Sequence, residues 1–476
     1  MAVSGRFASM VLQFTSALVI ARLLAPAEFG LFGIATSVVA ISASLREFGI
    51  TGFLVRLEVL DREALGRAFA FTMSISFTCG IAIFLARGEI AEYFHDPRLA
   101  NLIGIQCATF VLNPPTVGAN AVLSRQMRFG LINLIQVSIT LAALLLTLTL
   151  ATLGFGATSL AAGQVFQSTL LLICLTVVDW RNVLVWPVFS GLGAMFRFGS
   201  FAAMSGAVGQ IGNYVTSLVL GRLLGPAAVG YYDRGNGLFV AITDLVTAVG
   251  NVLFVGIAKA RTDSAEMATL VLRAMRNLTA VIWSGFLLLA ALSGPLIEVM
   301  FGAKWRPAVE VLQILCLSGI MMSGYVLLFQ TLVAMGATGR IFAIEATGQG
   351  TRVLAVLGLA RLGVLGAAAA SVVSTSLLFA LYLSVAHRYI RAHRRDVTAT
   401  LIQSLGIAVF TALPPALLVR YDPLVLPAFA HLVVGGLLGV ALWLCAIFAL
   451  RHDMSRELRA AAAQAWAKFG GAQQSD

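Results

Sequence analysis

The sequence predicts an all-α integral membrane protein in which about fourteen transmembrane helices form two six-helix lobes around a central cavity, followed by two C-terminal helices. Hydrophobic residues make up 59% of the chain and charged residues 11%, whereas soluble domains carry roughly a quarter charged residues. Apolar runs of about twenty residues, long enough to cross a bilayer as helices, alternate with short polar turns. A ten-residue turn motif recurs about two hundred positions later, which predicts an internal repeat.

The repeat is visible in three pairs of turns that keep their order along the chain. The first pair reads ARLLAPAEFG at 21–30 and GRLLGPAAVG at 221–230. The other pairs lie at 90–98 and 296–307, and at 154–156 and 363–366. An internal repeat of a six-helix unit is a common architecture of membrane transporters.

The expected spans follow from the apolar runs, each of which needs about twenty mostly apolar residues. They lie at 5–21, 28–45, 67–86, 101–122, 131–152, 158–178, 200–220, 235–256, 278–299, 309–331, 342–361, 364–385, 399–418 and 428–449. The spans group into an N-lobe at 1–180, a cytoplasmic linker at 181–198, a C-lobe at 199–386, an extra helix pair at 387–450 and a cytoplasmic amphipathic tail at 451–476.

The fourth span carries a strong helix-breaking signal. Pro114 and Pro115 follow Asn113 in the middle of its apolar run. Two prolines remove two backbone donors, so they must bend or break the helix. Such a bend suits a moving lobe, and a static kink is the alternative.

The net charge of +11 has two possible explanations, a negatively charged binding partner or the orientation of the chain in the membrane. The basic residues are scattered over many short loops instead of forming one stripe, which argues against nucleic acid. Most of them fall on one side of the expected spans. This positive-inside bias predicts that both termini are cytoplasmic.

No enzyme motif is present in the sequence. It contains no nucleotide-binding loop, no His/Cys/carboxylate cluster and no nucleophile motif, and its five cysteines lie inside apolar runs without metal-ligand spacing. We therefore expect no catalytic residues, no bound metal and no cofactor.

The order of the motifs resembles a known family. The turn at 21–30 is followed by REFGITGFLVR at 46–56, DPR at 96–98, LSRQMRF at 123–129 and GRLLGPAAVGYY at 221–232. Together these motifs resemble the polysaccharide-transporter branch of the multidrug/oligosaccharidyl-lipid/polysaccharide flippase superfamily, which includes Wzx-type lipopolysaccharide and exopolysaccharide flippases. Family members often carry an acidic residue on the seventh span, where this chain reads YVTSLVL.

The resemblance implies a multi-pass protein of the bacterial inner membrane that moves a substrate by alternating access. The implied substrate is an undecaprenyl-pyrophosphate-linked oligosaccharide, the repeat unit of an O-antigen, exopolysaccharide or capsule. Membrane lipids are implied as surroundings, with a polysaccharide polymerase and chain-length proteins as possible partners.

Moving a pyrophosphate and a sugar through hydrocarbon requires polar groups inside the membrane, and such groups are costly elsewhere. Glu345, Gln349 and Arg352 share one face of the eleventh span. We expect this face to line the cavity, with Arg352 near the pyrophosphate. The alternative is an internal Glu345–Arg352 pair that fixes helix packing.

The seventh and first spans, which are equivalent in the repeat, carry further candidates. Gln210, Asn213 and Tyr214 recur at helical spacing on the seventh span, and Arg6 and Gln13 lie about two turns apart on the first. Hydrogen bonding between helices is the alternative. Weaker candidates are Gln136, Gln164, Gln167, Gln313 and Gln330.

Three charged residues complete the candidates. Asp244 is the deepest acidic residue of the eighth span and the best candidate for ion coupling, although a structural hydrogen bond would explain it equally. Arg46 and Arg56 flank the second cytoplasmic loop and could meet the headgroup at the entrance, although positive-inside topology also explains them.

Two other functions remain open at this point. A cation-coupled multidrug exporter of the same architecture would favour an acidic, aromatic cavity over one that bears arginine. An integral-membrane glycan polymerase or ligase would need a large outside loop with catalytic residues, and the outside turns here are short.

Overall fold

The computed structural model describes residues 15, 18–47, 50, 54, 60–259, 264–386, 394–422, 426–450, 452–456 and 459. Helices dominate these residues, and none of them is in a β-strand. Nine helices in this part of the chain are long and apolar enough to cross a membrane, so this is a multi-pass membrane protein. Inside hydrocarbon, helices satisfy every backbone donor and acceptor within the segment, which explains why the apolar runs take this form.

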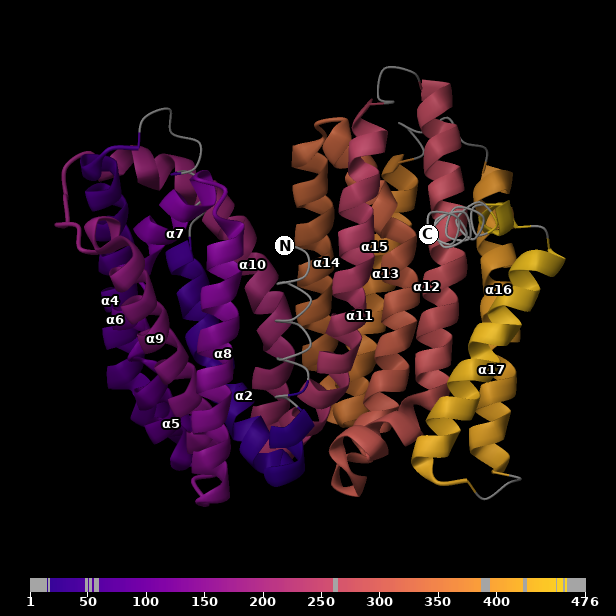
Figure 1. Cartoon of the computed structure of the whole chain (residues 1–476), viewed down its shortest axis with the longest axis horizontal. Coiled ribbons are helices and arrows are strands. Elements are labelled where there is room, and N and C mark those ends of the chain that lie inside the picture. The colour runs from indigo at the N-terminus through magenta and orange to yellow at the C-terminus, as the bar shows by residue number, and fades with distance from the viewer. Residues whose placement is uncertain are drawn as a thin grey trace, which may run out of the picture. The chain divides into compact units, whose positions relative to one another are not determined.

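The helices follow the expected spans (Figure 1). They are α2 (Pro26–Glu47), α4 (Arg62–Tyr93), α5 (Arg98–Gln106), α6 (Thr109–Leu112), α7 (Thr116–Arg125), α8 (Phe129–Thr152), α9 (Ala157–Val183), α10 (Leu192–Leu224), α11 (Pro226–Lys259), α12 (Ser264–Phe301), α13 (Ala308–Ala334), α14 (Thr338–Leu359), α15 (Val364–Ala386), α16 (Arg394–Tyr421) and α17 (Ala428–Ala449). The short 3₁₀ turns are η2 (Ala303–Trp305) and η3 (Ala360–Leu362). Most of the first span and of the C-terminal tail lies outside the described residues.

The fourth expected span is divided into three helices. α6 ends at Leu112 and α7 begins at Thr116, so Pro114 and Pro115 lie in the break between them. The predicted bend is confirmed, and its cause is the loss of two backbone donors.

The chain packs as two compact units. Met1–Asp233 and Val353–Ala367 form the first unit, and Arg234–Arg352 and Ala368–Asp476 form the second. These units are defined by packing and not by the repeat, so the lobe boundaries expected from the sequence stay a prediction.

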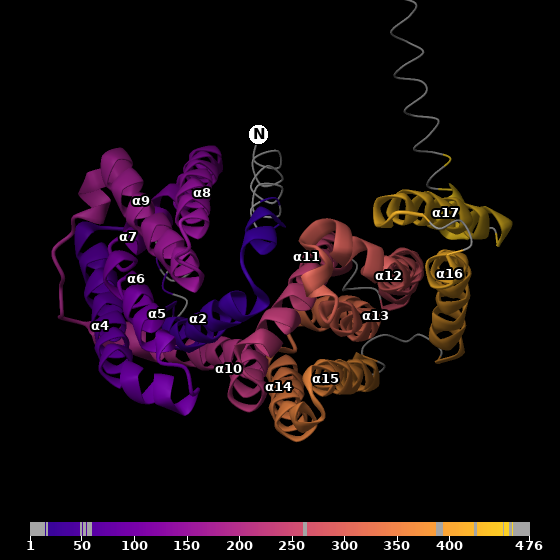
Figure 2. The same cartoon turned by 90° about the horizontal axis from the view of Figure 1, so that it is seen from below.

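In the first unit, α7 separates two hydrophobic clusters. Ala121 and Val122 belong to a cluster around Phe71 of α4, whereas Ala119 and Leu123 belong to a cluster with α8 and α9. α8 and α9 lie side by side, and α2 packs on α10 and α5 (Figure 2). The helices on both sides of α7 are therefore held by buried apolar contacts, while its N-terminal turn meets the break in the fourth span.

The two copies of the turn motif contact each other within the first unit. A Cβ atom on Gly30 would clash with the carbonyl oxygen of Pro226, and a Cβ atom on Gly230 would clash with that of Pro26. Each proline begins a helix, where its missing N–H costs nothing. The approach is reciprocal, so any larger residue at either glycine forces the two backbones apart.

The remaining markers of the first repeat meet at Glu28. One carboxylate oxygen of Glu28 accepts a hydrogen bond from the backbone N–H of Ala157 at the start of α9 (2.6 Å), and the other accepts from Arg98 Nη1 (2.9 Å). Arg98 also donates to Asp96 (Nη2–Oδ2 2.8 Å). A carboxylate at a helix N-terminus is stabilised by the free N–H groups and the helix dipole. Glu28 thus links three turns that are far apart in the sequence.

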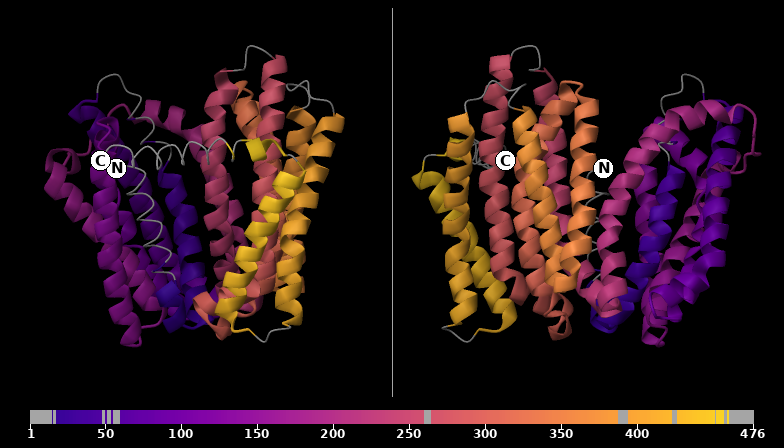
Figure 3. Two further views of the ribbon diagram at one scale, coloured as in Figure 1. Left: turned by 45° about the vertical axis from the view of Figure 1, so that its right-hand side comes forward. Right: turned by 180° about the vertical axis from the view of Figure 1, so that it is seen from behind.

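In the second unit, α12 packs against α13, α16 and α17 (Figure 3). Polar pairs join these helices at three points. Trp283 Nε1 donates to Ser323 Oγ (2.9 Å), Trp443 Nε1 donates to the carbonyl of Ala280 (3.1 Å), and the hydroxyls of Thr279 and Ser404 share a hydrogen bond (2.7 Å). The extra C-terminal pair is therefore attached to the second unit through α12.

The close approach of the two turn motifs predicts that replacing a glycine by alanine destabilises the fold at some positions and not at others. We expect Gly30→Ala and Gly230→Ala each to destabilise the fold by about 2–3 kcal/mol, because the added methyl group meets a backbone carbonyl. Gly88→Ala on α4 is the control: its Cβ meets nothing within 4 Å, and alanine is the better helix former. Thermal melting of detergent-purified protein measures the difference. Equal melting temperatures for Gly30→Ala and Gly88→Ala would contradict the close approach.

A second prediction concerns acid stability at Asp96. The Arg98 guanidinium hydrogen-bonds this carboxyl and holds the pKa of Asp96 below its ordinary value. The lowered pKa means that the pair stabilises the fold above the ordinary pKa of about 4 and that this stability is lost as the pH falls further. Because Arg98 is largely exposed, we expect at most about 1 kcal/mol.

Melting curves of the wild type and of Asp96→Asn between pH 3 and pH 7 test this prediction. The wild type should melt slightly higher at pH 7, and the gap should narrow as the pH falls toward 3. A gap of the same size at both ends of the range would show that the charge of Asp96 is not its cause.

Candidate functional site

The polar face of α14 is the first part of the candidate site. Glu345, Gln349 and Arg352 lie on one side of this 22-residue helix. At 1.5 Å per residue its length is about 33 Å, enough to cross a membrane. Yet α14 is too polar to count among the nine apolar spans found in the described residues. Its polar face would be costly against lipid, which favours a protein or water environment.

Glu345 is held by a neighbouring helix. The hydroxyl group of Tyr382 on α15 donates a hydrogen bond to Glu345 Oε1 (2.7 Å). Tyr382 is completely buried, stacks on Tyr325 (ring centroids 5.2 Å apart) and meets Phe329 edge-on. The carboxylate therefore has a rigid donor that belongs to the core of the second unit.

Arg352 does not have Glu345 as its partner. Within the described part of the chain, Arg352 forms no ion pair. Its Nε atom is shielded from solvent without a hydrogen-bond partner, and so is Oε1 of Gln349 one turn away. Buried polar atoms without partners are rare, and each calls for an explanation. The geometry speaks against the internal Glu345–Arg352 pair and leaves a guanidinium able to bind an anion.

The candidates on α10 belong to the first unit. Asn213 Nδ2 donates to Gln210 Oε1 (3.3 Å) across one helical turn, with Asn213 exposed and both Gln210 and Tyr214 half-buried. The pair is formed within α10, so it does not join two helices. Both side chains retain donors and acceptors for another group.

The other expected residues are less defined. Asp244 is exposed on α11. Arg46 belongs to α2, but the structure does not describe its side chain. Three further candidates lie wholly outside the described residues, namely Arg6, Gln13 and Arg56. Their roles stay predictions.

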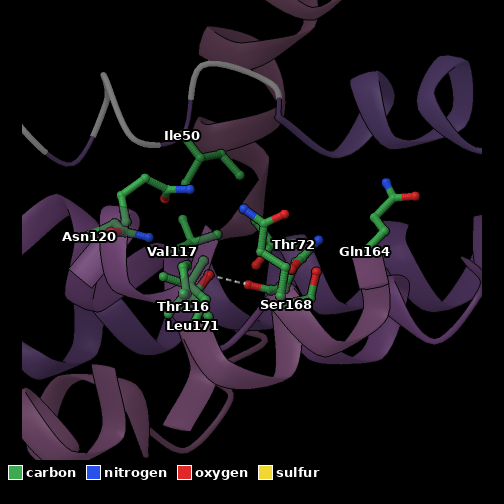
Figure 4. Close-up of a pocket in the computed structure, with 12 residues that line it drawn as sticks. Ile50, Thr72, Thr116, Val117, Asn120, Gln164, Ser168 and Leu171 are labelled. Carbon is green, nitrogen blue, oxygen red and sulfur yellow. Dashed lines mark hydrogen bonds between the residues drawn. The ribbon is translucent and has the colours of Figure 1, made fainter. Parts of the chain in front are cut away.

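A pocket of about 590 Å³ lies inside the first unit, at the break between α6 and α7 (Figure 4). It lies among α4, α7, α8 and α9, and most of its described lining is polar but uncharged. The polar lining residues are Thr72, Asn113, Thr116, Asn120, Gln136, Gln164, Gln167 and Ser168, and the apolar ones are Ile50, Val117, Ile139 and Leu171. We call this cavity the amide pocket.

The amides of this pocket are poorly satisfied by the protein. Gln136 and Gln167 both reach the hydroxyl of Thr140, at 3.4 and 3.5 Å, which is long for a hydrogen bond. Oε1 of Gln164 is buried without a partner. The Thr116 hydroxyl donates to the carbonyl of Asn113 (2.8 Å) at the helix break. Donors and acceptors therefore remain available to a ligand.

The sequence had indicated three of these glutamines only weakly, and it missed the other polar residues as site candidates. A signal was present: 113, 116 and 120 repeat at helical spacing, as do 164, 167, 168 and 171. Among the residues that the structure describes, no group of three or more His, Cys, Asp or Glu side chains could hold a metal ion.

Known proteins resemble this chain in sequence and in fold. It is 25% identical over 309 residues to the lipopolysaccharide biosynthesis protein WzxC of Escherichia coli (strain K12), covering 64% of this chain and 63% of the relative. It is 29% identical over 316 residues to the succinoglycan biosynthesis transport protein ExoT of Rhizobium meliloti (strain 1021), covering 64% and 62%. Both alignments span less than two thirds of the relative's length.

Among solved structures, the lipid II flippase MurJ in an inward closed conformation has a TM-score of 0.78 at 14% identity, covering 95% of this chain and 99% of that one. This likeness confirms the fold class expected from the sequence, an all-α membrane protein of about fourteen helices.

The family model described as polysaccharide biosynthesis protein matches residues 19–310, more than half of the chain. The protein therefore belongs to the polysaccharide biosynthesis protein family, and the resemblance carried by its motifs is confirmed.

Proposed function

We propose that this protein is a flippase that moves an undecaprenyl-pyrophosphate-linked oligosaccharide across the bacterial inner membrane by alternating access. The observation that carries the proposal is Arg352, a guanidinium on a helix of membrane length that has no ion pair among the described residues. The family and the two relatives support a glycan as the cargo.

The physical problem of this transport is the pyrophosphate. Crossing roughly 30 Å of hydrocarbon would strip water from an anion, at a cost far above ordinary binding energies. A guanidinium stays charged and presents a fork of donors that matches phosphate oxygens. Gln349, whose Oε1 is buried and unpaired, lies one turn from Arg352 and offers amide donors beside it.

The other functions are less well supported. A cation exporter of this architecture would favour an acidic, aromatic cavity, whereas the polar face of α14 carries Arg352, and the one carboxylate of that helix, Glu345, already accepts a hydrogen bond from buried Tyr382. A polymerase or ligase would need catalytic groups on a large outside loop. The connection between α8 and α9 is only a few residues long, as is that between α4 and α5.

The proposal includes the topology and the moving parts. Both termini are cytoplasmic, the lobes at 1–180 and 199–386 rock against each other, and Asp244 is the candidate for ion coupling. The bilayer holds the lipid tail. A polymerase and chain-length proteins of the same glycan are the expected partners.

Reconstitution tests the function directly. Purified protein in liposomes should move a fluorescent polyprenyl-diphosphate-linked oligosaccharide between leaflets, detected by loss of protection from a membrane-impermeant quencher. Transport of a cationic dye without transport of this lipid would favour the multidrug exporter.

Substitution of Arg352 tests the residue. We expect Arg352→Ala to lower transport at least tenfold, because the anion loses a charge-assisted bond of roughly 1.5–3 kcal/mol. Arg352→Lys should keep part of the activity, since it keeps the charge and loses the fork. Arg340→Ala, at the exposed start of the same helix, is the control.

Polysaccharide export and membrane abundance are measured together in cells that carry each variant. Normal export with Arg352→Ala at normal abundance would remove Arg352 from the site.

A further inference from the structure

We propose that the amide pocket is a saccharide-binding site that holds an uncharged sugar of the cargo while the pyrophosphate is bound elsewhere. The inference rests on the proposed function for the identity of the cargo. It assigns a role to a cavity that is separate from Arg352, which belongs to the other compact unit.

The chemistry of the lining matches sugar hydroxyl groups. A carboxamide offers two donors and an acceptor that takes two bonds, and a hydroxyl group of a sugar both donates and accepts. Five amides and three hydroxyls face the cavity; the amides belong to Asn113, Asn120, Gln136, Gln164 and Gln167. Such a lining can replace the water that a sugar must leave behind.

These amides form few hydrogen bonds within the protein. Neither Asn113 nor Asn120 has a side-chain hydrogen bond to another described residue, and Gln164 keeps a buried acceptor without a partner. The amide nitrogens of Gln136 and Gln167 both point to the hydroxyl of Thr140, at the long distances of 3.4 and 3.5 Å. Polar groups within membrane helices normally join neighbouring helices. Here they converge on a cavity instead, which favours ligand binding over packing.

Size and shape agree with this ligand. The volume of about 590 Å³ falls within the range of small-molecule sites. Val117, Ile139 and Leu171 give the pocket apolar patches beside the amides. A pyranose ring has the same division, with hydroxyl groups around its edge and C–H groups on its faces.

Because the lining is uncharged, it favours neutral sugars over charged ligands. No acidic or basic side chain occurs among the described residues that line the pocket. A phosphate or a uronic acid would therefore lose its hydration without gaining a counter-charge, and a cationic drug would find no carboxylate. The pocket favours uncharged sugars.

The break in the fourth span creates the pocket. α6 ends at Leu112, and the Asn113 carbonyl accepts hydrogen bonds from both the backbone N–H (3.0 Å) and the hydroxyl (2.8 Å) of Thr116. Thr116 and Asn120 then follow on the first turns of α7 (Figure 4).

The first test compares two cargoes in liposomes. One is a fluorescent polyprenyl diphosphate that carries a neutral trisaccharide of N-acetylglucosamine, mannose and galactose, and the other is the same lipid diphosphate without sugar. We expect Gln164→Leu to slow movement of the glycosylated lipid about threefold to tenfold, because neutral hydrogen bonds are lost. Movement of the bare lipid should stay unchanged. Arg352→Ala should slow both.

Controls separate binding from folding. Gln136→Leu is the second pocket variant, and Gln403→Leu is the matched control, because Gln403 lies half-buried on α16 in the second unit. Elution profile and melting temperature confirm that each variant is folded. Equal slowing of both cargoes by the pocket variants, or no slowing at all, overturns the proposal.

A second test does not depend on transport. Saturation-transfer NMR on the purified protein measures binding of methyl mannoside and methyl N-acetylglucosaminide, with methyl glucuronide as the charged comparison. We expect signals from the neutral glycosides that are weakened in Gln164→Leu, and a weaker signal from the glucuronide.

The two tests distinguish the two proposals. Binding of neutral glycosides that depends on Gln164 supports the pocket even if no cargo crosses the membrane, in which case the flippase function fails alone. Absence of binding to the wild type, or equal binding to Gln164→Leu, overturns the pocket and leaves the flippase function standing on its own transport assay.

Discussion

Within hydrocarbon, each backbone and side-chain polar group has to find its partner inside the protein, and this constraint governs the structure. It makes every long apolar run a helix. It also gives meaning to the places where partners are missing. Nε of Arg352 and Oε1 of Gln164 are buried without hydrogen bonds, in a chain whose threonine and serine hydroxyls commonly bond the carbonyl one helical turn back. In the two proposals above, these two atoms are the ones that a bound ligand would satisfy.

The two copies of the turn share their close approach and differ in their side-chain chemistry. Gly30 and Gly230 approach each other's proline carbonyls in the same way, so both copies of the turn are needed for one crossing. The position of Glu28 in the first copy is Ala228 in the second. The first copy can therefore tie the start of α9 and Arg98 to its turn, whereas the second copy cannot. The two copies of the turn therefore differ in the contacts that hold them.

The sequence predicts the helices well because hydrophobic length and proline are local signals. The apolar runs predict the spans, and Pro114 and Pro115 predict the break. The partner of Glu345 was beyond this reasoning, because Tyr382 lies on another helix and its register depends on packing. From spacing, Arg352 was one of the two alternatives for that partner. The amide pocket was beyond it for the same reason: apart from Ile50 and Asn113, its residues come from four different helices, α4, α7, α8 and α9.

A lipid-linked glycan poses two recognition problems that favour different solutions. The pyrophosphate is common to every such cargo, and a guanidinium binds it through charge, whatever sugar it carries. The sugar varies, and its hydroxyl groups call for many weak, directional bonds from uncharged groups. In this chain Arg352 and the residues of the amide pocket lie on different helices, so substitutions in the pocket leave Arg352 in place. A transporter built this way could acquire a new glycan by substitutions around the helix break while keeping its phosphate site.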